Sequence, residues 1–393
     1  MSGSTSLPPR AESRGCPPSR PDRRQRRSER IRRTRRRLRS WYARHARDLP
    51  WRRTRDPWAV WVSEVMLQQT QVATVVPYFE RFMKRFADVP ALARAPLDDV
   101  LKCWEGLGYY GRARNLHKAA KVVVDAFGGE LPRAADELRR LPGVGRYTAG
   151  AIASIAFGCD EPVLDGNVTR VLCRVFRVRT APKETATQKT LWSLARDLMP
   201  RGRAGEFNQA LMDLGATVCT SRRPACPRCP LRGVCLARAR GEETSLPVRT
   251  PRRPVPHWDV AVAVIRKRGR ILIARRKPEG LLGGLWEFPG GKRRRNESLE
   301  TCVVREVREE LGLEVRIRRA LVTARHAYTH FRVTLHAFEC DHVSGRPRPT
   351  AADAWTWVRP DDLDDYAFPG GSRKIIDALR SASTPPAASR RRK

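Results

Sequence analysis

The sequence contains no apolar run long enough to cross a membrane. The longest candidate, residues 149–157, is far shorter than the roughly 20 residues that a spanning helix needs. The charged N-terminus is followed by no apolar core, so it does not have the pattern of a secretory signal peptide. We therefore expect an intracellular protein of the cytoplasm or nucleoid with no membrane partner. Its ten Cys should lie in a reducing compartment, as metal ligands or small core residues.

Acidic residues are scarce. The chain of 393 residues has 41 Asp and Glu against 78 Lys and Arg, a formal net charge of +37. A basic excess of this size usually indicates a polyanionic partner, and nucleic acid is the leading class. The first 40 residues hold 14 Arg, but the remainder of the chain is basic too. A general Arg bias of the proteome is the alternative.

Composition and periodicity divide the chain into five segments and predict a multi-domain fold. Residues 1–38 are rich in Arg, Ser and Pro with almost nothing to bury, which indicates a disordered basic arm. Residues 39–236 carry apolar positions at helical spacing and predict a mostly α-helical domain. Residues 237–256 have the composition of a linker. Residues 257–380 predict an α/β domain, and residues 381–393 a disordered basic tail.

The predicted α/β domain begins with alternating apolar residues. Val260, Val262 and Val264 precede a turn at residues 268–270, which predicts a β-hairpin. The elements expected after it are a helix over about residues 299–311 that ends at Gly312 and strands at 332–338 and 355–358.

Four Cys are clustered near the end of the helical domain. Cys219, Cys226, Cys229 and Cys235 have the spacing C-x6-C-x2-C-x5-C. Four thiolates in a short loop can close on one metal centre. Zinc is the generic interpretation and is slightly favoured by the spacing alone, and a [4Fe–4S] cluster is the alternative.

A glycine-containing turn, residues 141–150, joins two helical segments. Gly143 and Gly145 allow the backbone to turn tightly, and the exposed N–H groups can hold a phosphate at the start of the next helix. This pattern is a helix-hairpin-helix signature, which binds the DNA backbone without sequence readout. An ordinary helix–helix turn is the alternative for such a glycine pair.

Two carboxylates are candidates for chemistry. Asp165 precedes a predicted helix, where a plain N-cap is the alternative. Glu64 lies within a mostly apolar helical stretch, so it is either on a solvated face or partly buried with a raised pKa. A raised pKa suits a general acid. Cleavage of an N-glycosidic bond to adenine needs such an acid and a negative charge beside the sugar.

In order and spacing, several segments closely resemble adenine DNA glycosylases of the MutY family. These segments are residues 58–74, 104–116, 141–150, 165–170 and the four Cys, and the match covers nearly all of residues 41–236. The order of the Cys also resembles endonuclease III and thereby favours the [4Fe–4S] cluster over zinc. The resemblance implies an N-glycosylase that removes adenine mispaired with 8-oxoguanine, or with guanine, from double-stranded DNA. We expect it to act as a monomer.

The resemblance also implies roles for individual residues. Glu64 protonates N7 of adenine, and Asp165 stabilises the sugar cation or a covalent intermediate, while Tyr147 and Asn167 support the two carboxylates. Endonuclease III carries at the position of Tyr147 the Lys that forms a Schiff base. Since tyrosine cannot form an imine, we predict a pure glycosylase that leaves an abasic site.

The resemblance implies that four further residues contact the DNA or the flipped adenine. Gln69 and Tyr109 fill or wedge the duplex where adenine has flipped out, as an enzyme acting on a paired base requires. Trp51 and Arg52 line the adenine pocket, and Arg52 also contacts DNA. For Tyr109 and Trp51, a place in the hydrophobic core is the alternative.

Residues 291–313 contain a complete Nudix box. In hydrolases with this box, residues at the positions of Glu306, Glu309 and Glu310 hold Mg²⁺ against a pyrophosphate. One interpretation is therefore a nucleoside diphosphate hydrolase. The other is a lesion reader, because MutY proteins carry a Nudix-like domain that recognises 8-oxoguanine, usually with a degraded box. The intact box departs from that pattern and leaves bound Mg²⁺ open.

The segment 326–331 resembles the Phe-Ser-His loop of the family, which makes Tyr328, Thr329 and His330 candidates for lesion recognition. We compared three classes of protein: an adenine glycosylase with a lesion reader, a Nudix pyrophosphatase with a helical DNA tether, and a DNA-binding protein without enzymatic activity. The third leaves Glu64 in an apolar helix without a role. The second leaves most of the chain unused. We therefore predict the first.

Overall fold

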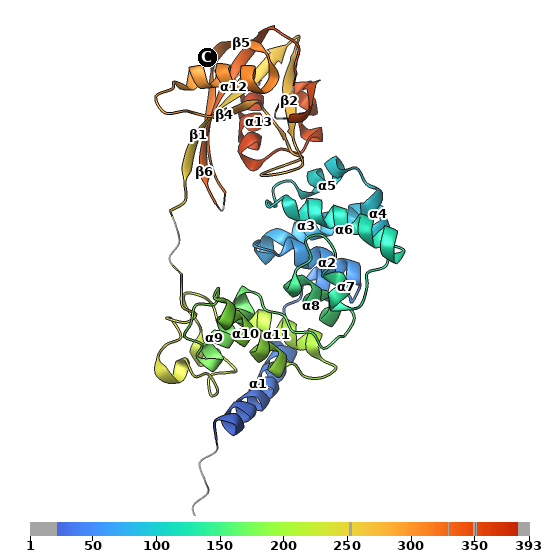
Figure 1. Cartoon of the computed structure of the whole chain (residues 1–393), viewed down its shortest axis with the longest axis vertical. Helices are drawn as coiled ribbons and strands as arrows, with labels where there is room; N and C mark the ends of the chain where they lie inside the picture. The colour runs from blue at the N-terminus through green and yellow to red at the C-terminus, as the bar shows by residue number, and fades with distance from the viewer. Residues whose placement is uncertain (1–21, 251–253, 329, 349, 351, 384–393) are drawn as a thin grey trace, which may run out of the picture.

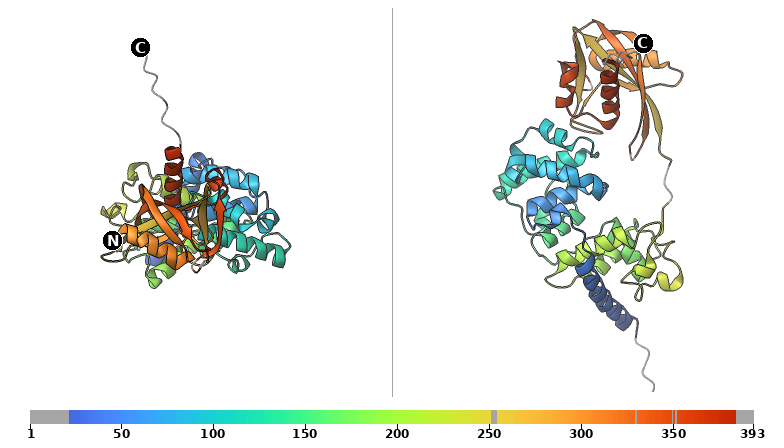
Figure 2. Two further views of the ribbon diagram at one scale, coloured as in Figure 1. Left: turned by 90° about the horizontal axis from the view of Figure 1, so that it is seen from above. Right: turned by 180° about the vertical axis from the view of Figure 1, so that it is seen from behind.

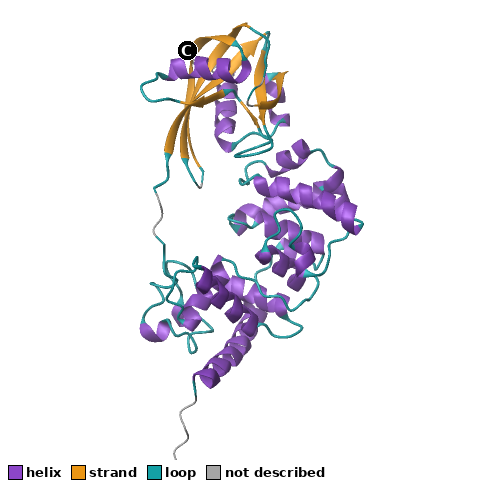
Figure 3. Cartoon of the chain, in the orientation of Figure 1, coloured by secondary structure: helices purple, strands orange, loops and turns teal. Residues whose placement is uncertain are grey.

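The computed structural model describes residues 22–250, 254–328, 330–348, 350 and 352–383. They form two helical bodies and one body that contains the β-strands, arranged in an arc (Figures 1 and 3). From behind, the helices of residues 57–155 again lie between the sheet and the helices of residues 166–217 (Figure 2). None of the helices described in this structure is long and apolar enough to cross a membrane.

The first helical body follows a short 3-10 turn, η1 (Pro50–Arg52). Its core contains fully buried Trp61, Phe82 and Trp104. Asp56 fixes the start of the first helix, because its side chain accepts bonds from the N–H groups of Trp58 and Ala59. The helices are α2 (Pro57–Met66), α3 (Val72–Arg85), α4 (Val89–Arg94), α5 (Leu97–Trp104), α6 (Gly111–Phe127), α7 (Ala135–Leu138) and α8 (Arg146–Ile155).

The second helical body is made from both ends of the helical region. It contains α1 (Arg23–His45), α9 (Gly166–Phe176), α10 (Thr185–Leu198) and α11 (Ala204–Thr217). The chain leaves this body after α1, builds the first body, and returns at α9 (Figure 1). A separate core holds the second body together, with Leu38, Leu172, Phe207 and Leu211 buried in it.

The prediction of a disordered arm over residues 1–38 is wrong from Arg23 onward, where α1 begins. A capping box between Asp22 and Gln25 starts the helix, and Leu38 is fully buried. Arg35 donates to the carbonyls of residues 197, 198 and 199 at the end of α10, at 2.7, 3.1 and 2.9 Å. Arg35 thus caps the end of another helix, whereas the prediction assumed that the Arg side chains only face solvent. Composition alone does not reveal such a contact. The remainder of the predicted arm, residues 1–21, lies outside the described residues.

The predicted linker, residues 237–256, is also shorter than expected. Its first part continues the second helical body, with the 3-10 turn η3 (Arg238–Arg240). Leu246 is buried, and its carbonyl accepts a bond from Arg174 at 2.9 Å. Glu242 forms an ion pair with Arg177 at 2.7 Å. Contacts far along the chain therefore fix a segment that its composition assigned to a linker.

The third body is a mixed sheet between two helices. The strand order is β3-β2-β1-β6-β5, with β1 and β6 parallel, and β4 and β7 pair with β1 and β2. Alternate residues of β1 face α12 on one side and α13 on the other. The elements are β1 (His257–Lys267), β2 (Arg270–Arg276), β3 (Trp286–Glu287), β4 (Gly290–Lys292), α12 (Leu299–Leu311), β5 (Glu314–Ala327), β6 (Arg332–Ser344), β7 (Ala352–Val358) and α13 (Gly370–Ser383).

The structure confirms the predicted hairpin and the helix that follows it. The hairpin of β1 and β2 turns at Arg268 and Gly269, both with positive φ. The helix α12 ends at Gly312 in the left-handed conformation, as expected. The strands β6 and β7 extend beyond the predicted bounds: β6 continues through buried Glu339 and Cys340 to Ser344, and β7 begins at Ala352.

Candidate active site

A cavity of about 1010 Å³ lies where the two helical bodies meet. Side chains from η1, α2, α8, α9 and α11 line it. Nine of the ten residues predicted for catalysis, the adenine pocket or DNA contact are among them: Trp51, Arg52, Glu64, Gln69, Gly143, Gly145, Tyr147, Asp165 and Asn167. The predicted residues thus come from both helical bodies, and they line the same cavity in the structure.

Glu64 is the first carboxylate of the cavity. It lies on α2 among buried residues and is only 5% exposed. Burial raises the pKa of Glu64 to about 7, although a hydrogen bond from Tyr147 opposes the rise. The Tyr147 hydroxyl donates to Oε2 at 2.6 Å. Of the two environments predicted for Glu64, the structure supports the buried one.

Asp165 is the second carboxylate and comes from the other body. It is also the N-cap of α9, which was the alternative interpretation of this residue. Its Oδ1 accepts a hydrogen bond from the N–H of Val168 at 2.6 Å. Asn167 donates from Nδ2 to Oδ2 at 2.8 Å. Burial raises the pKa of Asp165, and these two donors oppose the rise because they favour the ionised form.

Asn167 is itself held in place by the second helical body. Its Oδ1 accepts a bond from Arg170 at 2.7 Å, and Arg170 also donates to the carbonyl of Cys219 at 2.7 Å. The backbone of α11 passes so close that a Cβ on Gly215 would lie 2.6 Å from Cβ of Asn167. The support for Asp165 is therefore rigid, and it connects directly to the Cys loop.

A buried ion pair beside the cavity was not predicted. Asp213 on α11 has a fully buried side chain and accepts bonds from Arg52 at 2.6 and 2.9 Å and from Arg47 at 2.6 Å. Burial would raise the pKa of Asp213, but the hydrogen bonds and charges of the two Arg lower it. Arg52 lines the cavity as predicted, yet its guanidinium is bound to Asp213. The available signal was a carboxylate within an apolar helical stretch, the same pattern that identified Glu64.

The two residues predicted to fill or wedge the duplex have strained backbones. Gln69 and Tyr109 have φ of 60° and 49°, a region that residues with side chains rarely adopt. Gln69 lines the cavity, whereas Tyr109 does not. Arg112, which the sequence analysis did not single out, connects the two loops. It donates to the carbonyls of Gln68 and Gly108 at 2.7 and 3.0 Å.

The four Cys of the predicted metal centre line one cavity, together with apolar residues of α9 and α11. The fully buried Arg174 donates to Sγ of Cys219 at 3.2 Å. Four thiols in one apolar pocket are a suitable ligand set for an iron–sulfur cluster. Within the described part of the chain, no three His, Cys, Asp or Glu side chains are grouped so as to hold a metal ion. Both the presence and the identity of a metal centre therefore stay predictions.

The carboxylates of the Nudix box lie at i, i+3 and i+4 on α12 and so share one face, as expected. Arg305 donates to Glu306 at 2.7 Å and to Glu309 at 2.9 Å. Glu310 accepts from the N–H of Gly290 at 3.2 Å. All three carboxylates thus accept hydrogen bonds from protein donors. Mg²⁺ would have to replace these donors in order to bind, and bound Mg²⁺ stays a prediction.

The predicted lesion-recognition segment connects β5 and β6. The ring of Tyr328 stacks on Phe331 at 4.5 Å and contacts the edge of His326 at 4.6 Å. His330 is exposed. Thr329 lies outside the described residues. The aromatic part of the segment is thus a packed platform next to an exposed imidazole.

Two matches to known families agree with this division of the chain. Residues 62–197 match the family described as HhH-GPD superfamily base excision DNA repair protein, and residues 260–378 match the NUDIX domain. A solved structure of a thermostable thymine-DNA glycosylase is 30% identical with a TM-score of 0.50, and the match covers 54% of this chain and 98% of that one. The protein is thus a helix-hairpin-helix DNA repair protein with an appended NUDIX domain.

Longer relatives cover both domains. The chain is 38% identical to the adenine DNA glycosylase of Homo sapiens, over 86% of this chain and 72% of the human protein. It is 39% identical to the adenine DNA glycosylase of Mus musculus, over 86% of this chain and 76% of the mouse protein. The chain belongs to the adenine DNA glycosylase family, and it is a glycosylase of base excision repair. The thymine-DNA glycosylase of Aeropyrum pernix, 40% identical, matches only 51% of the chain.

Proposed function

We propose that the enzyme removes adenine paired with 8-oxoguanine, or with guanine, after turning the adenine out of the duplex into the cavity between the two helical bodies. The observation that carries this proposal is that Glu64 and Asp165, from different bodies, line one cavity. An enzyme that acts on a base in a duplex must first extrude that base. The cavity volume of about 1010 Å³ accommodates a purine.

In the proposed reaction Glu64 is the general acid. Adenine leaves poorly as an anion and well once its ring is protonated, so the acid must carry a proton at working pH. With a pKa of about 7, Glu64 is partly protonated near neutrality. The 2.6 Å bond from Tyr147 orients the carboxyl group within the cavity.

Asp165 then supports the sugar as positive charge develops on it. The donors Val168 and Asn167 favour the carboxylate form, and a fixed negative charge beside an oxocarbenium-like sugar lowers the barrier. Tyr147 offers no amine for a Schiff base, so water completes the reaction and the DNA strand remains intact. The expected product is an abasic site that breaks only on treatment with alkali.

Gln69 and Tyr109 are proposed to occupy the space that the flipped adenine vacates. Their unusual backbone conformations support this role, since such strain persists only where surrounding contacts hold it. Arg112 supplies those contacts, because it bonds to the carbonyls on both loops. The helix-hairpin-helix glycines, Gly143 and Gly145, would hold a backbone phosphate at the start of α8.

We further propose that Cys219, Cys226, Cys229 and Cys235 hold a [4Fe–4S] cluster. When bound, the cluster would cross-link the loop and stabilise the second helical body. Arg170 would carry this rigidity to the active site, because it bonds to both Cys219 and Asn167. Purified protein should be brown, with about four iron atoms per chain. Colourless protein with stoichiometric zinc would refute the cluster.

The NUDIX domain is proposed to read 8-oxoguanine through Tyr328, Thr329 and His330. Nucleoside diphosphate hydrolysis is the second candidate, favoured by the intact box on α12. Mg²⁺-dependent hydrolysis of 8-oxo-dGTP that disappears in Glu309→Gln would favour the second candidate. Absence of turnover with retained binding of 8-oxoguanine duplexes would favour the first.

The decisive experiment uses a duplex with one adenine opposite 8-oxoguanine. We expect strand breakage after alkali treatment, none without alkali, and none at all with Glu64→Gln. Breakage without alkali would refute the absence of lyase chemistry. Full activity of Glu64→Gln would refute the proposed acid.

A further inference from the structure

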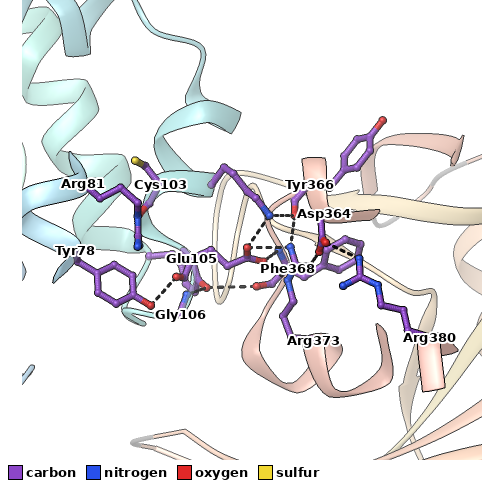
Figure 4. A network of polar contacts seen from close by, with 12 residues as sticks. Tyr78, Arg81, Cys103, Glu105, Gly106, Asp364, Tyr366, Phe368, Arg373 and Arg380 are labelled. Carbon is purple, nitrogen blue, oxygen red and sulfur yellow. Dashed lines mark hydrogen bonds and ion pairs between the residues drawn. The ribbon is translucent and has the colours of Figure 1, made fainter. Parts of the chain in front are cut away.

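The NUDIX domain contacts the first helical body through a polar network centred on Glu105, directly after α5 (Figure 4). Oε1 of Glu105 accepts the N–H of Phe368 at 2.8 Å and Nε of Arg373 at 2.5 Å. Oε2 accepts Nη2 of Arg373 at 2.9 Å and Nζ of Lys102 at 2.8 Å. Lys102 and Arg373 both donate to the carbonyl of Tyr366, at 3.1 and 2.8 Å. Glu105 is thus the centre of one polar contact between the two domains, and a second is the ion pair between Asp98 and Arg275 at 3.1 Å.

The network is shielded from solvent by apolar contacts between the same domains. The side chains of Glu105 and Arg373 are only 16% and 21% exposed. Leu285 and Ala367 of the NUDIX domain are buried in the core of the first helical body. Arg114 on α6 adds a bond to the carbonyl of Gly283 at 2.7 Å. Shielding of this kind strengthens the ion pair relative to one on the surface.

On the helical side, Glu105 begins the loop that carries Tyr109. The carbonyl of Glu105 accepts the hydroxyl of Tyr78 at 2.9 Å. The N–H of Gly106 donates to the hydroxyl of Tyr110, which in turn donates to the carbonyl of Phe368 at 3.4 Å. Both flanks of the proposed wedge residue, Gly106 and Tyr110, are therefore tied to the docked domain.

On the NUDIX side, Arg373 is in the first turn of α13, which packs against the end of β5. Lys374 donates to the carbonyl of Arg325 at 2.7 Å. A Cβ on Gly370 would lie 3.0 Å from the ring of His326, and that ring contacts Tyr328. The start of α13 thus touches Glu105 with one side chain and supports the proposed lesion-recognition segment with its neighbours.

We infer that Glu105 is a positioning residue that couples the lesion-recognition segment to the Tyr109 loop and thereby determines selectivity for the base opposite adenine. The inference rests on the proposed function. Glu105 does not line the active-site cavity, so its loss should leave the chemistry at Glu64 and Asp165 intact. Without its charge, Lys102 would lose its ion-pair partner and Arg373 would keep only Asp364, at 2.6 Å, which weakens docking.

The test compares Glu105→Gln, Arg373→Met and the double variant in the full-length enzyme. Single-turnover rates of adenine release are measured opposite 8-oxoguanine and opposite guanine. The matched control is Glu314→Gln, which removes the same charge from an exposed pair within the NUDIX domain, between Glu314 and Arg308. Thermal unfolding of every variant establishes that it is folded.

We expect Glu105→Gln to lower the ratio of the two rates about tenfold, within the range typical of coupling between sites. The rate opposite guanine should stay unchanged, and the control should keep the ratio of the unmodified enzyme. Arg373→Met should cause the same loss, and the double variant should lose no more than either single one. An unchanged ratio, an equal fall of both rates, or additive effects would overturn the inference. If the unmodified enzyme released no adenine from either duplex, the proposed function would fail instead.

Discussion

The hydrogen bond between Tyr147 and Glu64 makes a quantitative prediction about pH. The hydroxyl donates to Oε2 at 2.6 Å and so favours the ionised form, against the burial that raises the pKa of Glu64 to about 7. Substitution Tyr147→Phe removes this donor and keeps the ring. A bond to a charged group contributes about 1.5–3 kcal/mol, and one pKa unit corresponds to about 1.36 kcal/mol. The pKa of Glu64 should therefore rise further, by about 1–2 units.

The assay is the pH profile of single-turnover adenine release, each profile normalised to its own maximum. Because the acid must be protonated, the rate of the unmodified enzyme should fall about tenfold per unit well above pH 7. In Tyr147→Phe this fall of the rate on the alkaline side should begin at a higher pH, even if the maximum rate is lower. Tyr78→Phe, which removes a hydroxyl outside the cavity, should leave the pH at which the fall begins unchanged. If the alkaline fall of the rate in Tyr147→Phe began at the same pH or at a lower pH, the assignment of Glu64 as the acid would be refuted.

Three further predictions concern stability. Native Glu64 keeps its proton up to about pH 7 against an ordinary value of 4.5, so the native state loses stability as pH rises through that window. Glu64→Gln, besides abolishing adenine release, should therefore raise the melting temperature at pH 8 and not at pH 4. Asp213→Asn should lower the free energy of unfolding in urea by about 3 kcal/mol, because it leaves Arg47 and Arg52 without their buried partner. A loss below about 1 kcal/mol would contradict this. Leu38→Ala should cost about 2–5 kcal/mol by the same measurement, as expected of a fully buried side chain and not of a disordered arm.

Local signals in the sequence predicted much of the fold and singled out the two carboxylates of the cavity, whereas other cavity residues, such as Trp51 and Asn167, were predicted only through the family resemblance. The helix α12 has an N-cap at Ser298 and a C-cap at Gly312, so both of its ends are encoded within a few residues. Glu64 stood out because a carboxylate within an apolar helix needs a reason, and Asp165 because it follows the hairpin at a characteristic distance. These patterns can be recognised without knowledge of the tertiary structure, because each lies within one segment of the sequence.

The features that the sequence did not predict depend on contacts between distant segments. The helix α1 looked disordered because its charge dominates its composition, while its stability comes from Leu38 and from carbonyls about 160 residues away. Asp213 gains its role only when Arg52 meets it across the junction of the two bodies. Arg112 likewise acts on loops that are separate in sequence. Composition and periodicity carry no information about such partners.

The location of the cavity between two separate cores has a consequence for the chemistry. The proposed acid Glu64 lies on α2 in the first body and Asp165 at the start of α9 in the second, so their separation depends on how the bodies are held together. Tyr147, on α8, contacts Glu64 from the first body and Met212 from the second. The buried pair of Arg52 and Asp213 ties η1 to α11 beside them. Since a buried charge without its partner is very costly, this pair resists separation of the bodies. It therefore helps to hold the two helical bodies, and with them Glu64 and Asp165, at one separation.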